Sequence, residues 1–96
     1  MTAVVQADYK AQARILKALA HPTRLFIVDE LSRRERSVGE LTEMVGVEMA
    51  TVSRHLSLLK HAGILADEKR GVQVFYRLRV PCVRDFFKCV EAARTK

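Results

Sequence analysis

The chain has 96 residues, of which 49% are hydrophobic, 29% charged and 6% aromatic. This length and composition are typical of one small soluble domain and leave no room for a second. Because such a short chain buries only a modest core, we expect it to oligomerise. No apolar run approaches the roughly 20 residues of a membrane span, and the N-terminus lacks the apolar core of a signal peptide. We therefore expect a cytoplasmic protein with no membrane partner.

The formal net charge is +6, from 17 Lys and Arg against 11 Asp and Glu. Residues 1–20 carry 3 basic and 1 acidic side chains, residues 21–63 carry 6 of each, and residues 64–96 carry 8 and 4. A basic excess of this kind favours a polyanionic partner such as nucleic acid. The chain has no Gly-rich phosphate loop, no His-Glu-x-x-His pattern and no nucleophile paired with a base. We therefore expect neither catalytic residues nor a required cofactor.

Three helices are predicted in the first half of the chain. The first covers residues 8–19, and Pro22 suits the first position of the second, which fades into a loop at residues 32–36. Ser37 and Glu40 have the spacing of a capping box at the start of the third helix, which ends at Gly46. The apolar stripes of these helices contain Ile15, Leu16, Leu19, Leu25, Ile27, Val28, Leu31, Leu41, Met44 and Val45.

A fourth helix is predicted from near Glu48 to about His61. Because a tight turn joins it to the third helix, residues 37–62 have the pattern of a helix-turn-helix. At 100° per residue, one face of the fourth helix is apolar and is expected to pack on the core. That face contains Val52, Leu56 and Leu59.

The opposite face of the fourth helix has no carboxylate between Met49 and His61. Small, polar and cationic side chains allow a helix to enter the major groove and to bind base edges or phosphates. The alternative is an ordinary solvated helix face. We predict DNA contacts from Met49, Ala50, Thr51, Ser53, Arg54, Ser57 and His61.

From residue 64 onward the apolar period changes to two, which predicts an antiparallel hairpin over residues 64–79. Its strands are expected at residues 64–69 and 73–79, with Arg70 and Gly71 at the tip. Lys69 and Arg70 form a cationic point that could contact phosphates or a flanking minor groove, although a solvated turn is the alternative. Pro81 then opens a fifth helix. Its apolar stripe contains Val83, Phe86, Phe87, Val90 and Ala93.

The order and spacing of these motifs resemble the ArsR/SmtB family of bacterial winged-helix repressors. The resemblance spans residues 8 to about 94 and rests on the segments HPTRL (21–25), TVSRHLSLLK (51–60), AGIL (62–65), RG (70–71) and FYRL (75–78). It implies a mainly α fold, a winged helix-turn-helix of about five helices and a two-stranded wing, as a single domain over residues 1–96.

The resemblance also implies a homodimer, built on the helices of residues 8–20 and 80–94, that leaves operator DNA when an inducer binds. This chain departs from the family at the start of the fourth helix, where Glu48 replaces a common Ser. Met49 and Ala50 also replace residues that are commonly polar in the family. These differences bear on which bases the helix prefers.

The two cysteines, Cys82 and Cys89, are seven residues apart on the predicted last helix. Seven residues separate the thiols by about 10 Å along a regular helix, too far for a disulfide between them. If the helix starts late, Cys82 can fold back towards Cys89. Alternatively, the last helices of two subunits cross and bring Cys82 of one chain to Cys89 of the other.

Soft thiolates suit trivalent arsenic, cadmium or a persulfide. Cys82 is expected to be the more acidic thiol, because it lies near a helix start and close in sequence to Arg79 and Arg84. The family's cysteine pair in the third helix is absent here, and its Asp/His zinc site lacks a histidine. Cysteines on the last helix also occur in some arsenic-responsive relatives, so the resemblance favours arsenite or a methylated arsenical at Cys82 and Cys89. Thiol oxidation or persulfidation, a soft divalent metal, or a purely structural role for both cysteines are the alternatives.

Overall fold

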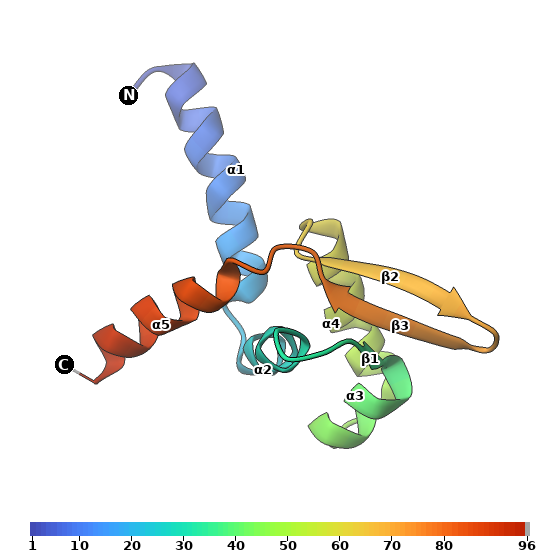
Figure 1. Cartoon of the computed structure of the whole chain (residues 1–96). Helices are drawn as coiled ribbons and strands as arrows, with labels where there is room; N and C mark the ends of the chain where they lie inside the picture. Colours follow the sequence, from blue (N-terminus) through green and yellow to red (C-terminus); the bar gives the residue numbers. More distant parts are fainter. Residues whose placement is uncertain (96) are drawn as a thin grey trace.

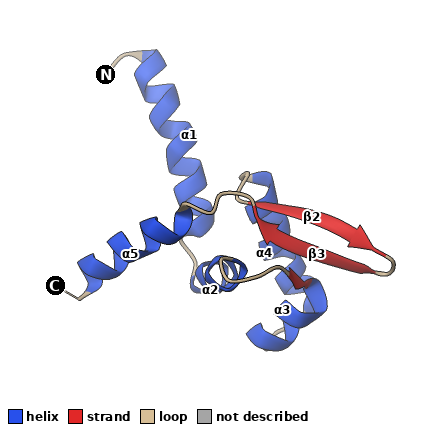
Figure 2. Ribbon diagram, in the orientation of Figure 1, coloured by secondary structure: helices blue, strands red, loops and turns tan. Residues whose placement is uncertain are grey.

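The computed structural model describes residues 1–95, and residue 96, the last of the expected domain, lies outside the described residues. This part of the chain contains five helices and a small three-stranded sheet, in a body of 48 × 33 × 22 Å (Figures 1 and 2). The predicted mainly α winged fold is confirmed. The elements are α1 (Ala3–Leu19), α2 (Pro22–Leu31), β1 (Arg36–Ser37), α3 (Val38–Val45), α4 (Met49–His61), β2 (Leu65–Arg70), β3 (Gln73–Leu78) and α5 (Val83–Arg94).

Helix α1 begins five residues before the predicted start at residue 8. Its N-cap is Thr2, whose side-chain oxygen accepts a hydrogen bond from the backbone N–H of Val5 at 3.3 Å. The added turn contains no Gly or Pro that would break it. A local cap therefore extends the helix beyond the amphipathic pattern that predicts it.

The predicted helix boundaries at α2 and α3 are confirmed by their caps. The ring Nδ1 of His21 accepts from the N–H of Thr23 at 3.1 Å and caps α2, which starts at Pro22. Ser37 and Glu40 form both hydrogen bonds of the capping box that opens α3. Gly46 ends α3 with a φ of 79°, a left-handed conformation that glycine adopts without strain.

Strands β2 and β3 form the predicted hairpin, in a register that runs from Leu65 opposite Leu78 to Arg70 opposite Gln73. The turn lies at residues 71–72, one residue later than the predicted tip. A third strand, β1, pairs antiparallel with β3 where the sequence predicts a loop. Because β1 has only two residues, it is too short to show the sequence pattern of a strand. Its pairing depends on β3, which lies beside it.

The core lies where α2, α3, α4 and the base of the hairpin meet. Val52, Leu56 and Leu59 of α4 are fully buried there, as predicted from the helical period. The largest fully buried side chains are Ile27, Val28, Leu41, Val52, Leu56, Leu59, Ile64 and Leu65.

Several apolar residues predicted to lie on inward stripes are exposed in the single chain. Only Ala18 and Leu19 of α1 are buried, and only Val83 of α5. Figure 1 shows the reason for the residues of α1 and α5: these helices project away from the core in different directions, so most of each helix has no neighbour within the chain. The exposed residues are Ile15, Leu16, Leu25, Met44, Phe86, Val90 and Ala93. No helix within residues 1–95 has the length and apolar character needed to cross a bilayer.

Candidate nucleic-acid interface

The face of α4 that points away from the core is exposed and free of carboxylates. Core packing of Val52, Leu56 and Leu59 fixes the rotation of the helix, so the opposite side chains face solvent. The structure thus brings the helix residues predicted to contact DNA onto one surface. The exposed members are Met49, Ala50, Ser53, Arg54, Ser57 and His61, and Thr51 is partly buried at the edge.

Two local contacts orient the polar side chains of this face. Nη2 of Arg54 lies 3.4 Å from the hydroxyl of Thr51, and Arg54 is in no ion pair within residues 1–95. Nδ1 of His61 donates to the carbonyl oxygen of Ser57 at 2.7 Å, which leaves Nε2 as the outward nitrogen. The face therefore presents the guanidinium of Arg54, hydroxyl groups and an imidazole nitrogen, all of which can bind base edges or phosphates.

The hairpin presents two different faces, and Lys69 lies on the one shared with α4. In the register, Lys69 is opposite Val74 and Asp67 is opposite the buried Tyr76. Nζ of Lys60 on α4 lies 3.1 Å from Oδ2 of Asp67, and this ion pair connects α4 to this face of β2. Lys69 is exposed and can therefore extend the polar surface of α4 towards a DNA backbone.

Arg70 lies on the opposite face of the hairpin, where carboxylates hold it. Its guanidinium contacts Glu35 at 2.6 and 3.2 Å and Glu68 at 2.6 Å, and it lies 4.6 Å from the centre of the Phe75 ring. The hydrogen bond and charge of Arg70 lower the pKa of Glu35, and the two carboxylates raise the pKa of Arg70. The sequence predicts DNA contacts from both Lys69 and Arg70. Because side chains alternate along a strand, the structure places the two on opposite faces of the hairpin.

The sequence interpretation missed three cations beside the C-terminal turns of α4. Arg14 and Lys17 of α1 and Arg24 of α2 line a cavity together with Leu58 and Ala62 of α4. The spacing of Arg14 and Lys17, three residues apart on one helix, was the signal available in the sequence. Arg24 lies beside Arg14 and Lys17 only because α1 packs against α2 and α4.

Cys82 and Cys89 are free thiols, and both are exposed. Helix α5 starts at Val83, so Cys82 is its N-cap, yet the φ of −63° and ψ of −14° at Cys82 are helical. The two thiols therefore keep a separation of about 10 Å along the axis. Residues 1–95 contain no cluster of three or more His, Cys, Asp or Glu side chains that could hold a metal ion. Within these residues, the single chain thus presents two accessible thiols and no closed metal site.

Together, a helix-turn-helix, an exposed acid-free second helix and a hairpin that follows it define a winged helix-turn-helix DNA-binding protein. A family model described as a helix-turn-helix domain matches residues 19–68. An uncharacterized HTH-type transcriptional regulator of Mycobacterium tuberculosis is 38% identical over 78 residues, which cover 80% of this chain and 68% of that protein.

The HTH-type transcriptional repressor SmtB of M. tuberculosis is 43% identical over 68 residues, 71% of this chain but only 50% of that protein. A solution structure from Mycobacterium bovis, a homodimeric winged helix-turn-helix domain of a possible ArsR-family regulator, has a TM-score of 0.84 at 29% identity. The match covers 99% of this chain and 88% of that one. The chain belongs to the ArsR/SmtB family of transcriptional regulators.

Proposed function

We propose that this protein is a homodimeric repressor that binds a two-fold symmetric operator in double-stranded DNA. The observation that carries the proposal is the exposed, acid-free face of α4, centred on Arg54, with Lys69 of the hairpin on the same side. In a dimer, two such helices about 34 Å apart would enter successive major grooves. Lys69 would contact phosphates beside each half-site.

The unpartnered stripes of α1 and α5 support dimerisation. Leu16 is 49% exposed on α1, and Phe86 and Val90 are 42% and 50% exposed on α5. Apolar side chains on two helices that project from the core favour contact with another surface. A second copy of the chain presents the same stripes, and the similar M. bovis domain is homodimeric.

The inducer proposed for this repressor is a thiophilic ligand bound by Cys82 and Cys89, with arsenite or a methylated arsenical favoured. Both thiols are exposed on α5, one of the two helices proposed to form the dimer. Because they lie too far apart on one helix, the ligand would bridge Cys82 of one subunit and Cys89 of the other. A ligand there must bind the DNA-incompetent state better by a few kcal/mol in order to release the operator.

The test starts with selection of an operator from random-sequence duplexes. Operator release is then titrated with arsenite, methylarsenite, cadmium, zinc and a persulfide donor, for the natural chain and for the Cys82→Ser, Cys89→Ser variant. We expect an arsenical to release the natural chain and to leave the variant bound. Release by the persulfide donor alone would indicate a thiol-redox repressor. Equal induction of the natural chain and of the variant would show that the cysteines have only a packing role. Duplex binding without sequence preference at low salt would contradict the proposed repressor itself.

A further inference from the structure

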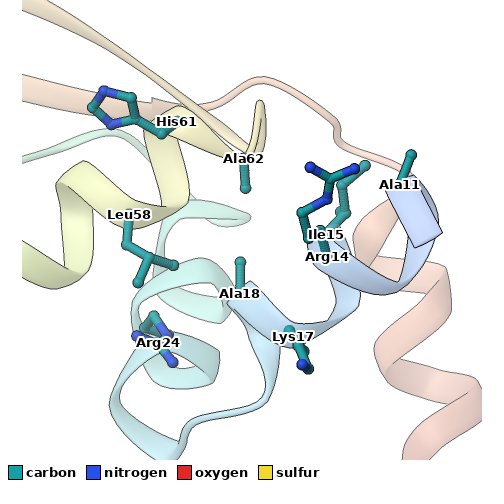
Figure 3. A pocket seen from close by; sticks show the side chains of 9 residues that line it. All are labelled: Ala11, Arg14, Ile15, Lys17, Ala18, Arg24, Leu58, His61 and Ala62. Carbon is teal, nitrogen blue, oxygen red and sulfur yellow. The ribbon is translucent and has the colours of Figure 1, made fainter. Parts of the chain in front are cut away.

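A cavity of about 490 Å³ lies between α1, the start of α2 and the C-terminal half of α4 (Figure 3). Its floor is apolar. In Figure 3, Ala18 of α1 and Ala62 of α4 point towards each other, Leu58 lies to the left of Ala18, and no acidic side chain lines the space. The apolar lining residues are Ala11, Ile15, Ala18, Leu58 and Ala62.

Three cations surround this apolar floor. Figure 3 shows Arg14 and Lys17 on the α1 side and Arg24 below Leu58, whereas the ring of His61 turns away from the cavity. Arg14, Lys17 and Arg24 form no ion pair with any carboxylate within residues 1–95. Like charges that share a cavity repel one another, and an anion placed among them removes that repulsion.

Arg24 supplies a second, independent observation. Its Nε is buried and has no hydrogen-bond partner within the described chain. Buried donors are nearly always paired in folded proteins, so a buried and unpaired guanidinium nitrogen is unusual. An anion in the cavity would bring an acceptor to this guanidinium.

We propose that the cavity binds a small organic anion that joins a carboxylate to an apolar body. The cations select the carboxylate, and the alanine and leucine floor selects the apolar body. A DNA phosphate matches this lining less well, because it has no apolar part to place on the floor. The proposed dimer stripe of α1 borders the cavity at Ile15, whereas Leu16 follows Arg14 by two residues, or about 200° around α1, and so faces away from Arg14. This site is separate from the proposed thiol site, and it borders the DNA-binding face at His61, whose ring points away from the cavity.

The test uses the full chain with octanoate as the probe, in 150 mM salt, observed by amide NMR. Octanamide has the same apolar body without the charge, and acetate has the charge without the body. We expect saturable shifts at Ala11, Ala18 and Ala62 with octanoate, at least about tenfold weaker binding of octanamide, and no binding of acetate. A tenfold difference corresponds to about 1.4 kcal/mol.

A pair of double variants provides the matched control. Arg14→Gln with Lys17→Gln removes two charges from the cavity, and Lys10→Gln with Lys88→Gln removes two charges outside it. All four sites are exposed helix positions, and melting curves verify that both variants fold. We expect the cavity variant to bind octanoate about tenfold more weakly and the control to bind it as the natural chain does.

Four outcomes would overturn the proposal. These are equal binding of octanoate and octanamide, no saturable shift, an equal loss in the control variant, or shifts centred on the α2–α5 surface near Phe26 and Phe87. Binding of both variants to a random duplex at low salt is measured in parallel. If the cavity variant loses duplex affinity far more than the control and octanoate does not bind, the three cations contact DNA phosphates instead.

Discussion

Arg54 is the residue of α4 best placed to read a base. It is exposed at the centre of the acid-free face of α4, and its guanidinium carries several hydrogen-bond donors. It has no carboxylate partner within the described chain. A bidentate contact to a guanine edge contributes about 1–3 kcal/mol of discrimination, so Arg54→Ala should weaken operator binding about 5- to 150-fold for each half-site and relax base choice. Fluorescence anisotropy with the selected operator and its single-base variants measures both effects. Lys88→Ala on α5 is the control, and unchanged operator binding by Arg54→Ala would contradict the facing of α4.

His55 predicts how stability responds to pH. Its ring lies 4.7 Å from that of His21, and desolvation, followed by the charges of His21, Arg24 and Arg54, lowers its pKa below the model-compound value of 6.5. As the pH falls below 6.5, the unfolded chain therefore binds a proton at this position before the folded chain does. The contribution of His55 to stability is present above pH 6.5 and is lost as the pH falls towards the lowered pKa.

We therefore expect the melting temperature to fall between pH 7.5 and pH 5.5, and to fall less in His55→Gln than in the natural chain. Thermal unfolding followed by circular dichroism measures the difference. His61→Gln serves as the control, because the ring of His61 is exposed. An equal decrease in the natural chain and in His55→Gln would show that the lowered pKa of His55 does not contribute to the pH dependence of stability.

At the scale of elements, the hairpin places Lys69 and Arg70 on opposite faces. Lys69 shares the face of α4, whereas Arg70 connects the hairpin to Glu35 in the segment before β1. Loss of one phosphate contact lowers the slope of log affinity against log salt by about 0.9. Because a dimer carries two copies of Lys69, Lys69→Ala should weaken binding evenly across sequences and reduce the slope by about 1.8, without a change in melting temperature.

Arg70→Ala should lower the melting temperature, because Glu35 and Glu68 lose their shared partner. Its effect on the salt slope should be smaller than that of Lys69→Ala. Salt titrations of operator affinity, combined with melting curves of both variants, separate the two roles. A loss of slope in Arg70→Ala as large as that in Lys69→Ala would mean that this guanidinium leaves Glu35 and binds phosphate in the complex.

At the scale of the whole molecule, α1 and α5 are the helices proposed to form the dimer. Their apolar stripes are exposed in one chain, so a charge placed there should disturb association more than folding. Phe86→Glu is expected to yield a folded monomer by sedimentation equilibrium, and to weaken operator binding because the two half-sites are no longer held together. Val72→Glu at the hairpin turn is the control and should stay dimeric, since Val72 is 99% exposed. A dimer that survives Phe86→Glu would place the interface elsewhere.

Much of the fold was predictable because its signals are local. The capping box at Ser37, the left-handed Gly46 and the proline at the start of α2 each act within a few residues, and the structure confirms them. The recognition face was also predictable, because burial of one side of an amphipathic helix determines the other. The assignment of particular residues to DNA contact stays a prediction.

Other features needed the tertiary structure, because they join segments far apart in the chain. The pairing of β1 with β3, the contact of Arg70 with Glu35 across 35 residues, and the cavity shared by α1, α2 and α4 carry no signal in any one segment. The sequence shows that α1 and α5 are amphipathic, but an apolar stripe looks the same whether it meets the core of its own chain or another subunit. Which of the two applies depends on where the rest of the chain lies, and the tertiary structure leaves both stripes uncovered.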